Sequence, residues 1–140
     1  MRNKGSKSAS SKTKVLAITA DAAFEEQIRS TFAAATQIEL AVLQGALAAT
    51  EAKINDEDMT VIVIDLDTRR DEDMAALTRL MGRTGGWPPV VVVTPTFDKD
   101  TARQMLQMRV ADFLVKPVQP VELVRTCARV VQTPTAGIKV

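Results

Sequence analysis

Five short apolar runs, separated by longer segments of mixed composition, constrain the fold of this chain more than any other feature. The runs cover residues 15–18, 38–43, 61–64, 90–93 and 113–115. Nearly continuous valine, isoleucine and leucine, without strict polar alternation, is typical of strands that are buried on both faces. Such strands pair in parallel, because helices cover both sides of a parallel sheet. The runs therefore predict a parallel sheet in the interior of the molecule.

The segments between these runs carry apolar residues at helical spacing. Phe24, Ile28 and Phe32 share one helical face, for example. Aspartates stand where helix N-caps are expected, at Asp21, Asp71 and either Asp98 or Asp100. The expected helices cover 22–35, 46–53, 71–82, 98–109 and 120–131. Strands that alternate with helices through right-handed crossovers predict a doubly wound α/β fold, with helices on both faces of a five-stranded parallel sheet.

Length and charge divide the chain into one domain and two short ends. A chain of 140 residues suits a single core, and we expect the domain to cover residues 14–131. Residues 1–13 are basic and rich in serine, without the apolar core of a signal peptide, and predict a disordered leader, native or left by cloning. Residues 132–140 predict a tail or linker. A single cysteine, Cys127, cannot form an internal disulfide, which favours the cytoplasm.

The residue types that the chain lacks exclude several functions. There is no histidine, which excludes histidine-dependent nucleophilic catalysis and zinc sites with histidine ligands. There is no glycine-rich phosphate loop, so we expect neither a flavin nor a nucleotide. The sequence has no basic stripe with interleaved aromatic residues, so we do not expect direct contact with nucleic acid. On its apolar helical face, Cys127 is either a small buried residue, the interpretation we favour, or a reactive thiol.

Polar residues follow three of the apolar runs at the point where each strand is expected to end. They are an acid, Asp65, a hydroxyl, Thr94, and an ammonium, Lys116. The carboxyl ends of parallel strands open on one crevice, so these side chains are expected to meet there. A carboxylate can attack a phosphoryl group to form an acyl phosphate, while a lysine and a hydroxyl contact its oxygens.

Each of these residues also has a structural interpretation. Asp65 and Lys116 can form a plain ion pair, and Thr94 can cap a turn. Asp21 can cap the helix that follows it or bind a metal, and the cap is the interpretation we favour. Asp67 can face the site or lie on the loop surface, and the sequence does not distinguish the two. The three acids at 71–73 are expected to lie in the first turn of a helix, where the helix dipole favours negative charge.

The stretch from residue 89 to 118, with Asp65 upstream, resembles the receiver domains of response regulators, and the overall resemblance covers residues 14–131. It implies a flavodoxin-like (CheY-like) sheet with strand order 2-1-3-4-5. It also implies that Asp65 is a phosphoacceptor and that Thr94 and Lys116 contact the phosphoryl group. Phe113 corresponds to a switchable aromatic residue, and Pro117 is expected to follow a cis peptide bond.

Two departures from the family pattern affect the expected Mg²⁺ site. Receivers bind Mg²⁺ partly through two adjacent acids after the first strand, where this chain has Thr19 and Ala20. Mg²⁺ requires near-octahedral oxygen ligands, so we expect weak binding at best, through Asp21, Asp65 and Asp67. The Pro-Gly pair usual after the phosphoacceptor is replaced by Arg69-Arg70, and Arg69 is a candidate to supply positive charge in place of the metal.

The resemblance implies two possible functions in the bacterial cytoplasm. In the first, a sensor kinase or phosphotransfer protein phosphorylates Asp65, and the face formed by 98–109, 112–115 and 120–131 rearranges. In the second, the chain is a pseudo-receiver for dimerisation or localisation, as in pilus assembly proteins of the CpaE/TadZ type, where such a domain precedes an ATPase. Mixed charges on 98–109 and 120–131 suit a symmetric self-contact. Neither function makes the chain an enzyme beyond self-phosphorylation at Asp65.

Overall fold

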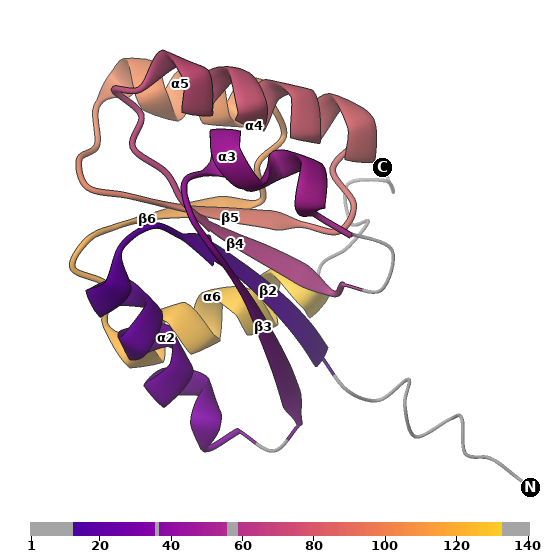
Figure 1. Cartoon of the computed structure of the whole chain (residues 1–140), viewed down its shortest axis with the longest axis vertical. Coiled ribbons are helices and arrows are strands. Elements are labelled where there is room, and N and C mark those ends of the chain that lie inside the picture. Colours follow the sequence, from indigo (N-terminus) through magenta and orange to yellow (C-terminus); the bar gives the residue numbers. More distant parts are fainter. Residues whose placement is uncertain (1–12, 36, 56–58, 133–140) are drawn as a thin grey trace, which may run out of the picture.

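A single parallel sheet forms the centre of the molecule (Figure 1). The structure is a computed structural model and describes residues 13–35, 37–55 and 59–132. Its strands are β2 (Thr13–Thr19), β3 (Ile38–Gln44), β4 (Val61–Asp65), β5 (Val90–Thr94) and β6 (Asp112–Val115). They lie in the order β3-β2-β4-β5-β6, and every neighbouring pair is parallel. In chain order this is 2-1-3-4-5, which confirms the expected topology. The predicted leader (1–13) and tail (132–140) lie outside the described residues, except for Thr13 and Gln132.

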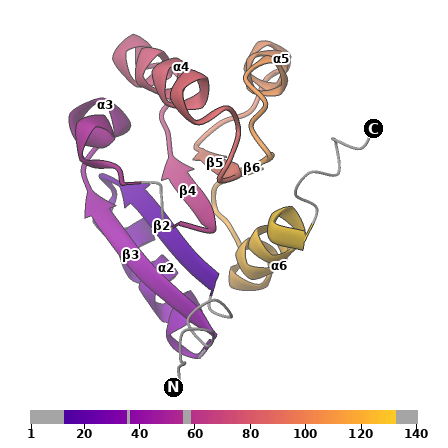
Figure 2. The ribbon, with the colours of Figure 1, turned by 90° about the vertical axis from the view of Figure 1, so that its right-hand side faces the viewer.

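Helices cover both faces of this sheet (Figures 1 and 2). On one face lie α2 (Ala22–Ala33) and α6 (Pro120–Gln132). On the other lie α3 (Leu47–Thr50), which the 3-10 turn η1 (Glu51–Lys53) continues, α4 (Asp71–Thr84) and α5 (Lys99–Gln107). The predicted helices are thus all present, with ends that differ by a few residues. No helix within the described ranges is long and apolar enough to cross a bilayer.

The core has two halves because successive strand residues point to opposite faces. Val61 and Val63 of β4 pack in the cluster with α2 and α6, whereas Ile62 and Ile64 pack in the cluster with α3, α4 and α5. All four are essentially inaccessible to solvent, and each contributes roughly 1.5–3 kcal/mol by leaving water. Cys127 belongs to the first cluster, and burial raises the pKa of its thiol to about 12. It is therefore a buried apolar residue, as expected, and not a nucleophile.

Capping side chains fix where two of the helices begin. The Asp21 carboxylate accepts hydrogen bonds from the backbone N–H groups of Ala23 and Phe24 at the start of α2. Asp98 accepts one from Thr101 at the start of α5. The prediction that Asp71 caps α4 is wrong. The residue before that helix is Arg70, whose side chain makes no capping bond, and Asp71 lies inside the first turn, where the helix dipole favours an acid.

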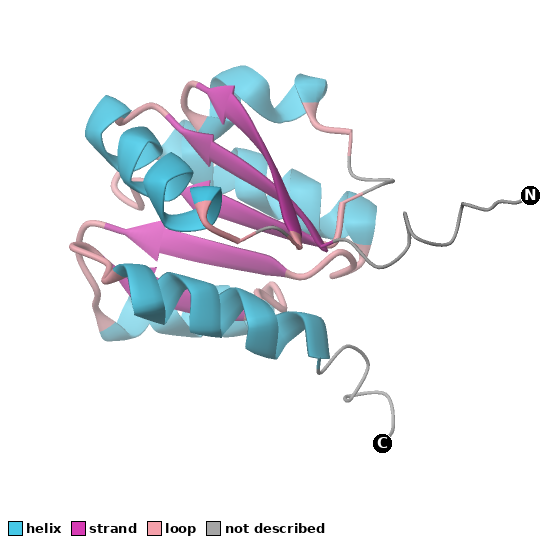
Figure 3. Ribbon diagram, turned by 90° about the horizontal axis from the view of Figure 1, so that it is seen from below, coloured by secondary structure: helices cyan, strands magenta, loops and turns pink. Residues whose placement is uncertain are grey.

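The strands all run in one direction, and Figure 3 shows their arrowheads pointing to one edge of the sheet. The loops that follow the strands therefore gather at that edge. This is the position at which folds of this class bind ligands, and it is where the polar residues at the strand ends lie.

Candidate functional site

The ammonium group of Lys116 joins two carboxylates at the carboxyl edge of the sheet. Its Nζ lies 3.0 Å from Asp65 Oδ2 and 3.0 Å from Asp21 Oδ2. Asp65 ends β4, Asp21 follows β2 and Lys116 follows β6, so three separate strands supply the cluster. The structure thus brings together Asp65, Lys116 and Asp21, which are 95 residues apart at most.

Thr19 is the partner of Asp65 that the sequence did not indicate. It is only 1% exposed, and its Oγ1 donates a hydrogen bond of 2.6 Å to Asp65 Oδ2. The same oxygen accepts a bond from the backbone N–H of Asp21. Asp65 Oδ2 therefore holds both the threonine hydroxyl and the Lys116 ammonium, while Oδ1 accepts no hydrogen bond from the part of the chain that the structure describes. A threonine that ends a strand gave no sequence signal for this contact.

The electrostatics of the cluster favour a charged lysine. Burial by itself lowers the pKa of Lys116, but hydrogen bonds to Asp65 and Asp21 outweigh burial and raise the pKa. The ammonium also lies 4.9 Å from the centre of the Phe24 ring, where a cation is attracted to the ring face. The hydrogen bond from Lys116, followed by that from the Phe24 backbone, lowers the pKa of Asp21 below its usual value. Asp21 and Lys116 therefore both remain ionised at neutral pH.

Thr94 lies beside the cluster without pointing its hydroxyl into it. Its backbone oxygen accepts a hydrogen bond of 2.9 Å from the Lys116 N–H. The buried Oγ1 donates instead to the backbone oxygen of Thr96, at 2.7 Å. This is the turn-capping geometry that was the structural alternative for Thr94. A phosphoryl contact requires the hydroxyl to leave Thr96.

The aromatic residue expected to switch is already stacked on another ring. Phe113 on β6 lies parallel to Phe97, with ring centres 5.2 Å apart and an interplanar angle of 13°. Phe97 belongs to the loop between β5 and α5 and is half exposed. Phe97 had no signal in the sequence, because a lone phenylalanine in a loop belongs to no motif. The Lys116–Pro117 peptide bond is cis.

An open pocket of about 280 Å³ lies at this edge of the sheet. Its lining combines acids and bases from several loops: Ala20, Asp21, Ala46, Asp65, Asp67, Arg70, Asp73, Pro95 and Lys116. Arg69 is not among these residues, since its guanidinium is turned to Asp67, with Nε 3.0 Å from Oδ1. Arg70, the other arginine of this pair, lies in the lining instead.

Asp73 connects this pocket to α3. It is 2% exposed, and its Oδ1 accepts a hydrogen bond of 2.9 Å from the backbone N–H of Ala48. Its Oδ2 lies 3.4 Å from Arg70 Nε. The residue before α3, Ala46, has no side chain that can cap the helix. Asp73 therefore serves as a cap supplied by a different helix, a role that its place in an acidic first turn did not reveal.

The acidic side chains of the site do not fit a divalent cation as they stand. The described residues contain no group of three or more acids arranged to hold a metal ion. The Lys116 ammonium lies between Asp21 and Asp65, and Asp67 is paired with Arg69. Mg²⁺ needs several oxygen ligands at near-octahedral positions, whereas here a positively charged nitrogen already contacts two of the three expected carboxylates.

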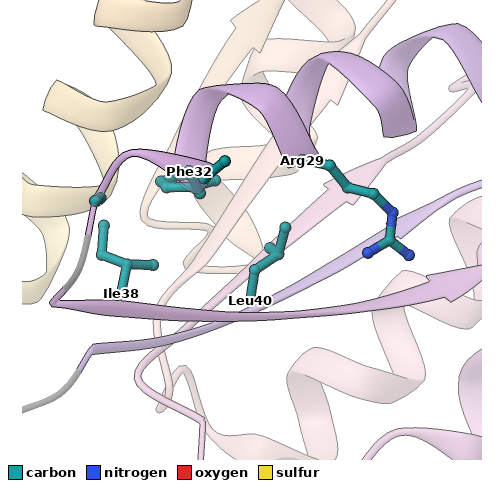
Figure 4. A pocket seen from close by; sticks show the side chains of 6 residues that line it. Arg29, Phe32, Ile38 and Leu40 are labelled. Carbon is teal, nitrogen blue, oxygen red and sulfur yellow. The ribbon is translucent and has the colours of Figure 1, made fainter.

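A second pocket, of about 370 Å³, lies far from these residues (Figure 4). It is formed by the end of α2 and the start of β3, and its lining is mostly apolar. Arg29 is the charged residue in that lining and pairs with Glu25 on its own helix. No titratable groups converge there, so the pocket at the carboxyl edge is the candidate functional site.

Comparison with known proteins gives a family match for most of the chain. The sequence profile described as "Response regulator receiver domain" matches residues 15–128. None of the curated proteins is similar enough in sequence to count as a match.

Solved structures share the fold at low sequence identity. One is described as a pilus assembly protein (CpaE) from Burkholderia thailandensis, with a TM-score of 0.73 and 18% identity over 86% of this chain and 98% of that one. Another is the chemotaxis protein CheY4 of Vibrio cholerae, with a TM-score of 0.71 and 19% identity over 85% and 98%. A CpaE2 pilus assembly protein of Sinorhizobium meliloti gives 0.69 and 19% over 84% and 98%. At these identities the likeness shows the fold alone.

Proposed function

The chain belongs to the response regulator receiver domain family, and from this premise we propose that Asp65 is its phosphoacceptor. Receivers are modules of two-component signalling and are typically non-catalytic apart from self-phosphorylation. The proposal gives this chain the same reaction. A sensor kinase or phosphotransfer protein supplies the phosphoryl group in the cell, and a small acyl phosphate can supply it in vitro.

One observation carries the proposal: Lys116 Nζ lies 3.0 Å from Asp65 Oδ2 at the pocket. The ammonium can follow the charge from the carboxylate to the oxygens of an attached phosphoryl group, because a lysine acts as a mobile point charge. Thr94, one strand away, supplies a hydroxyl donor once it leaves Thr96. Phe113 lies on the strand that leads to Lys116, so movement of these residues alters its stacking on Phe97.

Incubation with acetyl phosphate and Mg²⁺, followed by intact-mass measurement, tests this assignment. We expect the mass of one phosphoryl group to be added to the wild-type chain. Asp65→Asn removes the nucleophilic carboxylate and should abolish the adduct. Asp71→Asn, an exposed acid outside the pocket, is the matched control and should retain it. An adduct that persists in Asp65→Asn would show that another residue is the acceptor.

We also propose that Mg²⁺ binds this chain weakly. Members of the family typically bind this ion, but Lys116 and Thr19 here contact the oxygens that it would use. Titration with Mg²⁺ should leave the NMR signals of Asp21, Asp65 and Asp67 little changed up to millimolar concentrations. The tryptophan is unsuitable as a probe, because Trp87 precedes β5 at the opposite edge of the sheet. Saturation at micromolar Mg²⁺ would contradict the proposal.

A second candidate function is self-association without phosphorylation. Three exposed apolar side chains lie on α5, β6 and α6: Leu106 is 71% exposed, Val115 40% and Val121 61%. We call the surface formed by α5, β6 and α6 the α5–β6–α6 face. The strand β6 is the last in the strand order, so no further strand pairs with it on this side of the sheet. A second copy of the chain is the proposed partner of this face. Proteins described as CpaE, which share the fold, give this alternative its context.

The two functions place the chain in the same compartment. Receiver domains generally act in the cytoplasm, and we propose the bacterial cytoplasm for this chain. The proposed partners are a phosphate donor at the pocket and a protein, another copy included, at the α5–β6–α6 face.

A further inference from the structure

A phosphoryl group on Asp65 adds negative charge to a pocket that is already acidic. Four aspartates line the pocket: Asp21, Asp65, Asp67 and Asp73. Conversion of a carboxylate to an acyl phosphate adds about one further negative charge. Because the donor set does not fit a divalent cation, basic side chains must balance this charge.

The pocket lining contains two basic residues, Lys116 and Arg70. Lys116 contacts both Asp21 and Asp65 at 3.0 Å, so its single positive charge is already shared between two carboxylates. Arg70 is therefore the positive charge that remains for an incoming anion. Arg69 is not equivalent, because its guanidinium makes two hydrogen bonds to Asp67 and it is not part of the lining.

A buried carboxylate keeps Arg70 at the pocket. Asp73 is fixed by its bond to the Ala48 N–H, and its other oxygen lies 3.4 Å from Arg70 Nε. The outer nitrogen, Nη2, pairs at 2.9 Å with Glu72 on the surface. Exposed ion pairs of this kind are weak. Nη2 can therefore exchange Glu72 for a phosphoryl oxygen while Nε stays beside Asp73.

The hydrogen bonds of Asp65 indicate which of its oxygens reacts. Oδ2 accepts bonds from Thr19 and Lys116, whereas Oδ1 accepts none from the described residues. A lone pair of Oδ1 therefore attacks the phosphorus of acetyl phosphate. The new bond joins Oδ1 to phosphorus, the bond between phosphorus and the acetate oxygen breaks, and acetate leaves with that electron pair. No proton needs to be transferred in this step.

From these contacts we propose that Arg70, together with Lys116, binds the phosphoryl group on Asp65 and supplies the positive charge that a divalent cation supplies elsewhere in the family. This inference rests on the proposed function of Asp65. A guanidinium suits the role because its planar donors bind two oxygens of a phosphoryl group at once. Phosphorylation of this chain should accordingly proceed without a divalent cation.

The test measures the rate of adduct formation with acetyl phosphate in EDTA, by intact mass, for variants at the two neighbouring arginines. Arg70→Gln should slow the reaction about tenfold, the loss expected for one charged hydrogen bond. Arg69→Gln, the matched control, should react like the wild type, and Arg70→Lys should recover part of the rate. Thermal melting of each variant establishes that it is folded.

The outcomes separate this inference from the function on which it rests. An adduct that forms only with Mg²⁺ and is equally fast in Arg70→Gln supports Asp65 as the acceptor and overturns the role of Arg70. A loss of rate in Arg69→Gln rather than Arg70→Gln also overturns it. No adduct on folded wild-type protein under any condition overturns both proposals.

Discussion

At the residue scale, the replacement of an acid by Thr19 changes what the site contains. An acid at this position would repel Asp65, and a cation would be needed between them. A threonine instead donates a hydrogen bond of 2.6 Å to Asp65 Oδ2. Lys116 then contacts both Asp21 and Asp65, and its single positive charge is shared between the two carboxylates. Thr19 therefore removes the acid that receivers usually carry at this position and adds a hydrogen-bond donor to Asp65.

Restoring the adjacent acids should restore a metal site. In the double variant Thr19→Asp, Ala20→Asp, two carboxylates are added beside Asp65, and their mutual repulsion favours a divalent cation. Even residues that only support the ligands of a metal change its affinity by about tenfold or more. Two added ligands should therefore raise the affinity for Mg²⁺ by at least about tenfold. Isothermal titration calorimetry measures this change. Thr19→Val, which removes the hydroxyl without adding charge, is the control and should not gain affinity.

The pairing of Asp21 with Lys116 makes a prediction about pH. The hydrogen bond from Lys116 lowers the pKa of Asp21 below its ordinary 3.8. The pair therefore stabilises the fold above that pH, and this stabilisation is lost as the pH falls through the lowered pKa. In Lys116→Met, an NMR titration of the carboxyl carbon should show the pKa of Asp21 moving up toward 3.8.

Glu25 is the internal control for this titration. Hydrogen bonds from Gln44 and Arg29 lower its pKa, and neither bond involves Lys116. Its pKa should be the same in Lys116→Met and in the wild type. A shift of both acids would show a general change in the fold, and no shift of Asp21 would contradict the pairing.

At the scale of elements, the short helix α3 depends on a neighbouring helix for its cap. The residue before α3 is Ala46, and no side chain of α3 satisfies its first N–H groups. Asp73 on α4 accepts the bond from Ala48 instead. The contact ties α3 to α4, and the same carboxylate holds Arg70 at the pocket. The contact between α3 and α4 therefore also fixes the position of Arg70 at the pocket.

Removal of this carboxylate should destabilise the protein more than removal of an exposed acid in the same turn. Asp73→Ala leaves the Ala48 N–H without its partner, and we expect a loss of about 1–3 kcal/mol in the free energy of unfolding. Asp71→Ala, on the exposed side of α4, should change it by about 0.5 kcal/mol or less. Urea denaturation followed by circular dichroism measures both. Equal losses would contradict the cap.

At the scale of the whole molecule, the two edges of the sheet differ. The β3 edge lies beside the apolar pocket of Figure 4. The β6 edge belongs to the α5–β6–α6 face, where apolar side chains are exposed on three successive elements. Because Lys116 directly follows β6, the pocket at the carboxyl edge and this face share one segment of chain. If Asp65 is phosphorylated as proposed, the change at the pocket can therefore reach the α5–β6–α6 face.

If this face joins two copies, acidic substitutions on it should separate them. Leu106→Glu combined with Val121→Glu places like charges opposite each other in a symmetric contact, which is unfavourable. We expect the molar mass from light scattering to fall from that of a dimer to that of a monomer. Trp87→Gln changes an exposed aromatic residue that belongs to none of these three elements; it is the control and should leave the mass unchanged. A wild-type monomer at all concentrations would contradict self-association.

Periodicity and strand-end chemistry in the sequence were sufficient for the fold and for part of the site. Apolar runs buried on both faces dictate parallel strands, and parallel strands bring their carboxyl ends to one edge, so the convergence of Asp65 and Lys116 follows from local pattern. Contacts that depend on side-chain direction do not follow in this way. Tertiary packing decided that Thr19 bonds to Asp65, that Asp73 caps α3, and that Arg70 rather than Arg69 lines the pocket. Adjacent residues in a loop point in different directions, and only the surrounding structure selects which one reaches the site.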